Sequence, residues 1–314
     1  MMKRLAAVWS ALLLLAGSLA AQQPAKTPAP PPTPPPTDNI KVRVDLVNVL
    51  MTVTNKKNHL ENGLGKEDFR VYEDNKPQAI RYFSRETDLP LRIGVLVDTS
   101  ASIHDRLRFE QEAAIDFLNN TLRPGKDLAF VEAFDVQPQT VQDYTDDMRK
   151  LSEAIRSLMA GGVTTLFDAI YLSCRQKMLV FPPPEPYLRR VMIVISDGED
   201  NQSQYTREEA LAMAQRAEVT IYTISTSETG VPGHGDKVLR RLAEGTGGRA
   251  FFPFKPDETG ADFREIAREL RSQYSLAYVS TNTAHDGTFR SISIEPLLKG
   301  LQVRAKPGYF APSE

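Results

Sequence analysis

Apolar and polar residues alternate along both ends of the globular part of this chain. Within residues 41–54, alternate positions such as Val42, Val44 and Leu46 are apolar, which predicts a strand, and the polar turn at 55–58 predicts a hairpin partner directly after it. The same period predicts further strands at 69–72, 80–83, 274–279, 289–294 and 301–305. Since isolated hairpins are only marginally stable, we expect the N- and C-terminal strands to pair into one small β domain.

The pattern changes at Leu91, where short apolar runs begin to alternate with amphipathic helical segments. The runs Ile93–Val97 and Val191–Ile195 have no polar position, as expected for central parallel strands covered by helices on both faces. The remaining strands are predicted at 128–134, 220–224 and 250–252, and the helices at 105–122, 147–159, 167–178, 207–217, 237–244 and 262–272. This order predicts an α/β fold, a doubly wound and mostly parallel sheet flanked by helices, inserted in the small β domain.

The segment before the first strand has a different composition. A basic start containing Lys3 and Arg4, an apolar stretch from Leu5 to Leu15 and small residues up to Ala20 are typical of a signal peptide, which we place at residues 1–20. The apolar stretch is shorter than the ~20 residues that span a bilayer, so cleavage is favoured over a membrane anchor. We therefore expect an exported protein, periplasmic or extracellular, with no membrane span in the mature chain.

Residues 22–37 contain eight prolines in sixteen positions, which favours an extended and solvated conformation. We interpret residues 21–39 as a Pro-rich linker, with a proline-motif ligand for another protein as the alternative. The boundaries that follow are an N-terminal β segment at 40–90, the α/β domain at 91–272 and a C-terminal β segment at 273–314.

Charge and cysteine content restrict the function further. The formal net charge is -2, and removal of Lys3 and Arg4 with the signal peptide would make it -4, so bulk charge gives no attraction to nucleic acid or anionic lipid. Cys174 is the only cysteine, which excludes an internal disulfide, and its apolar helical setting predicts a buried structural thiol. The four histidines are dispersed and lack the spacing of a zinc site.

Polar residues gather where predicted strands end. Asp98-Thr99-Ser100-Ala101-Ser102 follows the first central strand, and Asp197 follows the strand that ends at Ile195. Between them, the glycine-rich stretch 161–165 carries two threonines before a helix. In open α/β sheets ligands bind outside the carboxyl ends of the strands, so we expect these three loops to converge on one site.

These residues resemble the von Willebrand factor type A domain, also called the integrin I domain, and its metal-ion-dependent adhesion site. That site combines D-x-S-x-S, a loop threonine and an aspartate in a D-G sequence. The resemblance covers about residues 91–272 and implies five metal-site residues, namely Asp98, Ser100, Ser102, Thr164 and Asp197. Thr164 is preferred to Thr165 because the family places an Ala-aliphatic pair five residues after the ligand threonine, which Ala169-Ile170 fit.

The flanking segments resemble those of secreted bacterial VWFA-related proteins. The similarity lies in Glu67-Asp68-Phe69-x-Val71-Tyr72-Glu73-Asp74 and in Lys306-Pro307-Gly308-Tyr309. It implies architecture more than function.

The resemblance also implies a mechanism of binding. The hydroxyls of Ser100, Ser102 and Thr164 would bind Mg²⁺, or Mn²⁺ or Ca²⁺, directly, and the two aspartates would act mostly through water. Hard oxygen donors of this kind suit Mg²⁺. The implied partner is a protein that offers an Asp or Glu carboxylate to the ion, so we expect adhesion or protein binding and no enzyme activity. In the family the last helix moves when a ligand binds, and here that helix, near residues 262–272, leads directly into the terminal strands.

Each motif also has a simpler interpretation. Ser102 with Asp105, and Thr165 with Asp168, could be helix-capping pairs, and Asp197-Gly198 could be only a turn. The occurrence of all three motifs in the right order favours the metal site. Two other functions remain open. One is a structural envelope component with a fold-stabilising metal, and the other is a metal-dependent hydrolase, which lacks an identifiable general base.

Overall fold

The computed structural model describes residues 46–85, 88–101, 106–179, 188–227, 233–253, 255 and 258–313. The predicted signal peptide and Pro-rich linker lie outside the described residues. Ser102 also lies outside them, as does Asp105, its capping partner in the alternative interpretation. Within the described part of the chain, no helix combines the length and apolar character needed to cross a membrane.

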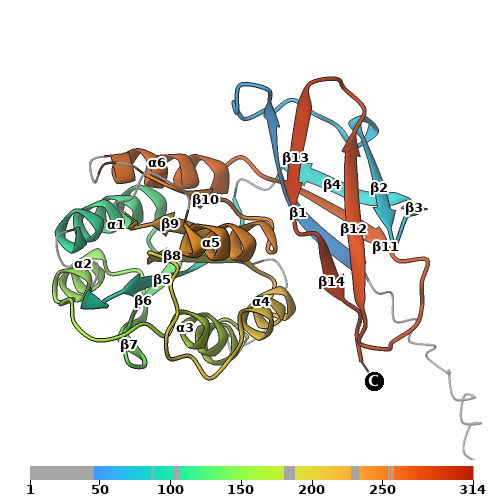
Figure 1. The fold of residues 1–314 in the computed structure, drawn as a ribbon. Helices are drawn as coiled ribbons and strands as arrows, with labels where there is room; N and C mark the ends of the chain where they lie inside the picture. The colour runs from blue at the N-terminus through green and yellow to red at the C-terminus, as the bar shows by residue number, and fades with distance from the viewer. Residues whose placement is uncertain are drawn as a thin grey trace, which may run out of the picture. The chain divides into compact units, whose positions relative to one another are not determined.

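A six-stranded sheet forms the centre of the α/β domain (Figure 1). Its strand order is β10 (Ala250–Phe251), β9 (Val219–Ser225), β8 (Arg189–Ser196), β5 (Leu91–Asp98), β6 (Leu128–Phe134) and β7 (Pro138–Thr145). All neighbours are parallel except β6 and β7. The fold class expected from the sequence is therefore confirmed, and β5 and β8 are the two central strands whose runs are apolar throughout.

Helices cover both faces of this sheet because its central strands are apolar on both sides. Ile93 and Val95 of β5 pack with α1 (Leu107–Thr121), α2 (Met148–Arg156) and α6 (Thr259–Leu270). Leu96 of the same strand packs on the other face, whose helices are α3 (Leu166–Ser173), α4 (Arg207–Arg216) and α5 (His234–Glu244). The α3 helix continues as one π-helical stretch, η3 (Cys174–Met178). Each face has its own buried core.

One strand and one helix start illustrate where this domain differs from the sequence prediction. The edge strand β7 was not predicted, since its sequence begins with proline and is mostly polar, as is common for edge strands. The α5 helix begins at His234, three residues before the predicted start, where the Asp236 carboxylate accepts a hydrogen bond of 2.9 Å from the Gly233 N–H. That acidic residue satisfies a backbone donor at the helix N-terminus.

The terminal segments form two four-stranded sheets that share one apolar core. One sheet has the order β13 (Leu301–Ala305), β1 (Leu46–Asn55), β11 (Tyr274–Val279) and β4 (Ile80–Arg85). The other has the order β14 (Gly308–Phe310), β12 (Phe289–Pro296), β2 (Phe69–Glu73) and β3 (Lys76–Gln78), with a short 3₁₀ helix η1 (Lys66–Asp68) before β2. N- and C-terminal strands thus pair directly, as expected, and we call this unit the β domain.

The hairpin partner predicted directly after β1 is wrong. The chain makes only an isolated bridge between Thr54 and Leu60 there, and β1 instead pairs antiparallel with β11 and β13, more than 200 residues later in the sequence. The local alternation of β1 correctly indicates a strand, but it contains no information about which strand lies beside it.

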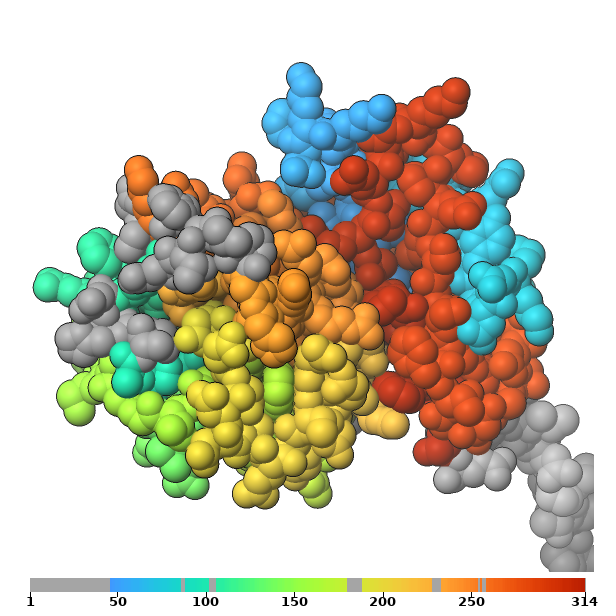
Figure 2. Space-filling view, in the orientation of Figure 1, coloured from blue at the N-terminus to red at the C-terminus, as the bar shows by residue number. Residues whose placement is uncertain are grey.

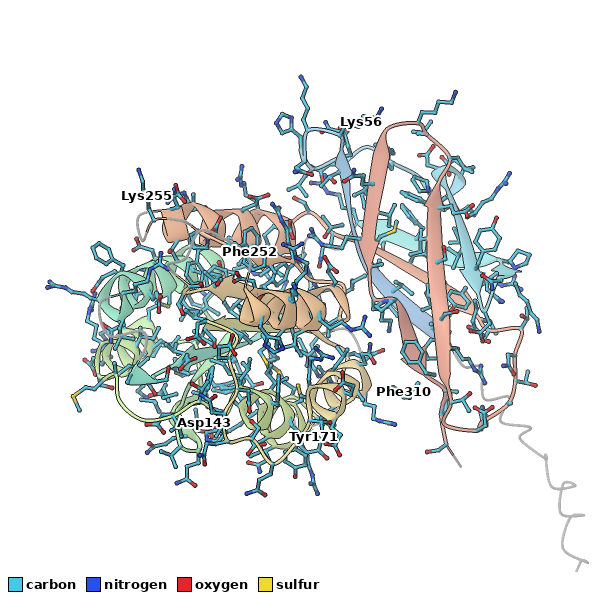
Figure 3. The ribbon with its side chains drawn as sticks, viewed as in Figure 1. Lys56, Asp143, Tyr171, Phe252, Lys255 and Phe310 are labelled. Carbon is cyan, nitrogen blue, oxygen red and sulfur yellow. The ribbon has the colours of Figure 1, made fainter. Side chains whose placement is uncertain are left out.

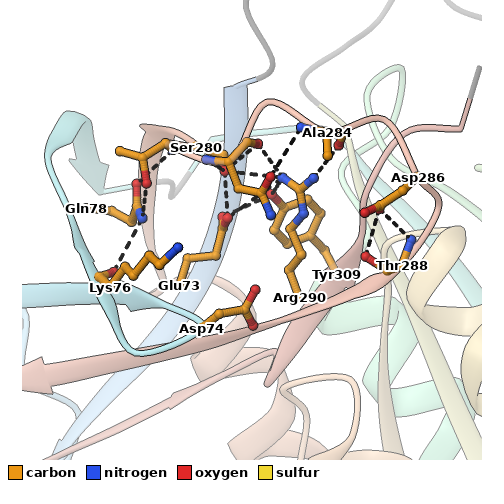
Figure 4. A network of polar contacts seen from close by, with 12 residues as sticks. Glu73, Asp74, Lys76, Gln78, Ser280, Ala284, Asp286, Thr288, Arg290 and Tyr309 are labelled. Carbon is orange, nitrogen blue, oxygen red and sulfur yellow. Dashed lines mark hydrogen bonds and ion pairs between the residues drawn. The ribbon is translucent and has the colours of Figure 1, made fainter.

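A buried polar network joins the N- and C-terminal strands of the β domain (Figure 4). The Glu73 carboxylate accepts hydrogen bonds from the hydroxyls of Tyr278 (2.8 Å), Ser280 (2.6 Å) and Tyr309 (3.0 Å), and Arg290 lies 3.8 Å from it. Burial of polar groups is tolerated when their hydrogen bonds are satisfied. The two flanking motifs seen in the sequence therefore meet in this network, the first through Glu73 and the second through Tyr309.

Polar contacts also surround the point where α6 leads into β11. The Gln273 side chain donates to the hydroxyls of Thr52 (3.1 Å) and Tyr222 (3.4 Å) and accepts from Arg189. Glu269, near the end of α6, pairs with Arg304 of β13. The end of α6 is thus bonded to strands of the β domain as well as to the α/β sheet.

Candidate functional site

Asp98 is the last residue of β5, and its side chain is fully buried. One carboxylate oxygen accepts a hydrogen bond from the Ser100 N–H (2.9 Å), and the other accepts from the Ser196 hydroxyl (2.7 Å). Burial raises the pKa of Asp98 to about 6, although the bonds from Ser196 and Ser100 act in the opposite direction, and the charge of Asp197 adds to the increase. Both oxygens are therefore oriented by neighbouring loops.

The end of β8 supplies the second carboxylate. Asp197 accepts a hydrogen bond of 3.0 Å from the Glu199 N–H, which makes the turn that the sequence indicated. Gly198 has a positive φ of 79°, and a Cβ placed there would lie 2.3 Å from the Gly235 carbonyl oxygen. A Cβ on Gly235 would in turn lie 2.1 Å from the carbonyl oxygen of Asp197. Two glycines thus allow the D-G turn to pack directly on the start of α5.

The glycine-rich loop before α3 is held against the end of β5 by backbone hydrogen bonds. The Gly161 N–H donates to the Thr99 carbonyl (2.7 Å), and the Ala101 N–H donates to the Gly162 carbonyl (3.3 Å). The Thr164 carbonyl accepts from the N–H groups of Asn201 (3.1 Å) and Gln202 (3.2 Å). These bonds connect all three predicted loops at the carboxyl edge of the sheet.

Side chains of the D-G loop cap α3. The Phe167 N–H donates to Asp200 (3.0 Å), and the Asp168 N–H donates to the Ser203 hydroxyl (3.0 Å). The alternative interpretation, in which Thr165 and Asp168 form a capping pair, does not hold. The Thr165 side chain makes no cap hydrogen bond, and Asp168 accepts instead from the N–H groups of residues 204 and 205. The helix start that follows Thr164 is consequently fixed by the loop that follows Asp197.

The Thr165 hydroxyl has a different role. It donates a hydrogen bond of 2.9 Å to the carbonyl of Asp135, the residue that follows β6. A Cβ on Gly162 would lie 3.1 Å from the Asp135 side chain, so this loop passes close to the end of β6. The end of β6 therefore supports the glycine-rich loop from a third strand.

Glu110 is a further acidic residue at this edge of the sheet that sequence analysis missed. Its side chain is buried, and burial raises its pKa to about 8, with Arg106 lowering it and the charges of Asp98 and Asp197 raising it. Its Oε2 atom is buried and accepts no hydrogen bond from the described residues. A signal was present in the sequence, because Glu110 occupies the apolar stripe of α1 between Leu107 and Ala114.

Of the five predicted metal-site residues, four are described. Asp98 and Ser100 are joined by a hydrogen bond, Asp197 lies close enough to raise the pKa of Asp98, and Thr164 is bonded through its backbone to the D-G loop; Ser102 lies outside the described residues. In the described ranges no three His, Cys, Asp or Glu residues are grouped as a metal site. The polar residues at this edge carry carboxylates and hydroxyls, oxygen groups of the kind that suit a hard cation such as Mg²⁺.

Two features away from the candidate site are also clear in the structure. Cys174 is fully buried, and burial raises the pKa of its thiol, so the prediction of a structural cysteine is confirmed. The Gly245-Thr246-Gly247-Gly248 stretch ends α5, with Gly245 as the C-cap and a positive φ of 81° at Gly247. It forms the C-cap and the turn that follows the helix.

Comparison with known proteins identifies the α/β domain. Residues 93–269 match the von Willebrand factor type A domain family. No curated protein matches the chain.

Several solved structures have a similar fold. A von Willebrand factor type A protein from Catenulispora acidiphila is 13% identical, with a TM-score of 0.51 over 86% of this chain and 74% of that one. Proximal thread matrix protein 1 from the mussel byssus, whose MIDAS motif is occupied by zinc, is 18% identical, with a TM-score of 0.51 over 63% of this chain and 50% of that one. BatB from Bacteroides thetaiotaomicron is 18% identical, with a TM-score of 0.47 over 58% of this chain and its own full length. At these identities the likeness concerns the fold.

Proposed function

This chain belongs to the von Willebrand factor type A domain family, and from this premise we propose that it is a metal-dependent protein-binding module of an exported protein. The observation that carries the proposal is the position of Asp98. Its buried carboxylate lies at the carboxyl edge of the sheet, with both oxygens oriented by Ser100 and Ser196 and with Asp197 nearby. Asp98 is buried and Asp197 is half-buried, and two carboxylates close together favour a bound cation, which offsets their repulsion.

The proposed metal-site residues are Asp98, Ser100, Ser102, Thr164 and Asp197. Thr164 is supported over Thr165, because the Thr165 hydroxyl already donates to the Asp135 carbonyl on the side of β6. The Thr164 carbonyl, in contrast, accepts two hydrogen bonds from the D-G loop, at Asn201 and Gln202, and so ties its residue to that loop. Asp98 fits an indirect role through water, since each of its oxygens already accepts a hydrogen bond.

When bound, Mg²⁺ or a similar divalent cation would attract a carboxylate of a partner protein to an open coordination position. The residues of this chain supply orientation and charge balance. Neutral hydroxyls nearest to the ion leave part of its positive charge uncompensated, which favours an Asp or Glu of the partner as the ligand. Binding, and not turnover, is the proposed activity, with a position in the periplasm or outside the cell supported by the sequence of residues 1–20.

The test compares Asp98→Asn with a matched control, Asp143→Asn, on the exposed strand β7. The asparagine can still accept the Ser100 N–H, so the variant should fold. We expect Mg²⁺ to raise the melting temperature of the wild type and of Asp143→Asn but not of Asp98→Asn. In a pull-down from extracellular or envelope extract, partners should be retained in Mg²⁺ and lost with EDTA or with Asp98→Asn.

The outcomes separate the alternatives. If Mg²⁺ stabilises the wild type but the retained partners do not change with EDTA or Asp98→Asn, the metal has only a structural role and the binding proposal fails. If Asp98→Asn responds to Mg²⁺ as the wild type does, Asp98 is not part of the site. Turnover of a substrate that disappears in Asp98→Asn would favour a hydrolase instead.

A further inference from the structure

Two turns of the β domain lie side by side at one end of its sheets. In the antiparallel pair of β1 and β13, Asn55 lies opposite Leu301. The turn after β1, residues 56–59, and the turn between β12 and β13, residues 297–300, therefore extend beyond the same end of this pair. A Cβ placed on Gly300 would lie 3.6 Å from Cε of Lys56, which shows that the two turns are in contact. We call residues 56–59 and 297–300 the β-domain tip.

The β-domain tip is basic. Lys56, Lys57 and Lys299 are exposed, and together with His59 they line a surface hollow with Asn55 and Gly300. Figure 3 shows Lys56 between the two turns, and both turns lie at the surface in Figure 2. The tip itself contains no acidic residue.

Two of the acidic side chains next to the tip make hydrogen bonds within the β domain. Glu61 accepts a hydrogen bond of 2.9 Å from the Asn55 side chain, and Asp68 accepts one of 2.8 Å from the Gly65 N–H. Asp68 also accepts the Leu297 N–H through its backbone carbonyl, at 2.8 Å. The three lysines of the tip are exposed and form no ion pair within the described part of the chain. The two turns themselves are therefore positively charged, although the whole chain is slightly negative.

The tip also exposes two consecutive leucines. Leu297 and Leu298 are 47% and 48% exposed, in a turn where polar residues and glycine are the usual choice. Single exposed apolar residues are common, but an adjacent pair at a turn, followed directly by Lys299, is a different arrangement. Gly300 supplies the positive φ, +87°, at the end of this turn. The geometry of the turn therefore does not require the leucines.

We propose that the β-domain tip is a peripheral binding site for an anionic lipid bilayer. Lysines next to a membrane are attracted by negatively charged headgroups, and short apolar side chains among them can enter the boundary between headgroups and acyl chains. A soluble polyanion would explain the lysines but not the exposed leucines. The site is independent of the metal site, and it would hold the β domain at a membrane surface without any spanning segment.

The experiment measures co-sedimentation of the purified protein with vesicles of phosphatidylcholine that contain 30% phosphatidylglycerol, and with vesicles of phosphatidylcholine alone. Because each lysine near an anionic surface contributes about fivefold in binding, we expect Lys56→Gln, Lys57→Gln and Lys299→Gln together to weaken it on the order of 100-fold. The matched control carries Lys150→Gln, Lys237→Gln and Lys255→Gln, three exposed lysines of the α/β domain with the same change in net charge. It should bind within about twofold of the wild type, since its charges lie away from the contact.

A second variant tests the apolar part. Leu297→Ser with Leu298→Ser keeps the charge and should weaken binding about tenfold, because apolar surface is no longer transferred from water. Soluble glycerol phosphate at millimolar concentration should displace little protein. The proposal is overturned if the wild type prefers neither vesicle, if the tip and control lysine variants bind equally, if the leucine variant binds as the wild type does, or if glycerol phosphate releases the protein. Unchanged melting curves would show that each variant is folded.

Discussion

Glu132 provides a direct test of how burial sets the stability of the α/β domain. It lies within the sheet on β6, is 4% exposed, and accepts a hydrogen bond of 2.8 Å from the Ser173 hydroxyl. Burial raises its pKa to about 7, from 4.5, although the bond from Ser173 and the charge of Lys177 act in the opposite direction. Glu132→Gln keeps the shape and the acceptor for Ser173 but removes the charge, so we expect it to stabilise the protein at pH 8.

The sign follows from proton linkage. Between pH 4.5 and about 7 the folded state holds the Glu132 proton more tightly than the unfolded state does, so stability falls as the pH rises through this window and then stays constant. One pKa unit corresponds to about 1.4 kcal/mol, so the difference between 4.5 and about 7 amounts to about 3 kcal/mol as an upper value. Below pH 4 the wild type and the variant should be equally stable.

The measurement is urea unfolding of wild type and Glu132→Gln at pH 4 and pH 8. The free energy of unfolding should differ by about 1–3 kcal/mol in favour of the variant at pH 8 and by little at pH 4. Glu153→Gln, on the exposed side of α2, is the matched control and should follow the wild type at both values. If Glu132→Gln is no more stable at pH 8 than the wild type, burial does not disfavour the charged form of Glu132, and the reasoning is wrong.

Two further predictions concern contacts on which the domain depends. Asp127 is buried and accepts hydrogen bonds from Arg123, Arg271 and the Leu91 N–H, which outweigh the effect of burial and lower its pKa to about 2. Asp127→Ala should therefore lower the free energy of unfolding by about 3 kcal/mol at pH 7, which urea unfolding would measure. The difference in stability between the variant and the wild type should shrink as the pH falls from 3.8 to about 2. At that pH the wild type also loses the charge of Asp127. Gly198→Ala should lower the melting temperature and abolish the Mg²⁺ response, because its Cβ would collide with the Gly235 carbonyl, whereas Gly161→Ala meets no atom within 4 Å and should leave the fold intact. Equal melting temperatures for the two glycine variants would contradict this account.

The sequence predicts the α/β fold well because its signals are local. The apolar runs of β5 and β8 can be satisfied only under helices on both faces, and the amphipathic segments supply those helices. What it does not predict depends on distant parts of the chain. The polar strand β7 forms because it pairs with β6, and β1 finds its partners in β11 and β13. The local order of apolar and polar residues in a strand does not indicate which strand it pairs with.

The candidate site shows the same division. The motifs point to Asp98, Asp197 and the hydroxyl residues as the proposed metal-site residues, since carboxylates and hydroxyls at strand ends are recognisable types. They do not identify Ser196, whose hydroxyl donates to Asp98 and accepts from the Gly198 N–H at 3.0 Å, or the contact of Gly198 with Gly235. A serine before an aspartate is too common to stand out, and a close approach of two glycines from different loops appears only in three dimensions.

These unpredicted contacts determine how rigid the site is. Metal affinity depends on donors that are held in place before the ion binds, because donors that must first be ordered lose part of the binding free energy to conformational entropy. Here the order comes mainly from backbone groups, with Thr99 bonded to Gly161 and Thr164 bonded to the loop after Asp197. A chain that kept the five motif residues but lacked the glycines at 198 and 235 would have the donors of the site without their arrangement. We therefore expect metal binding in related sequences to follow these two glycines as closely as it follows the motif.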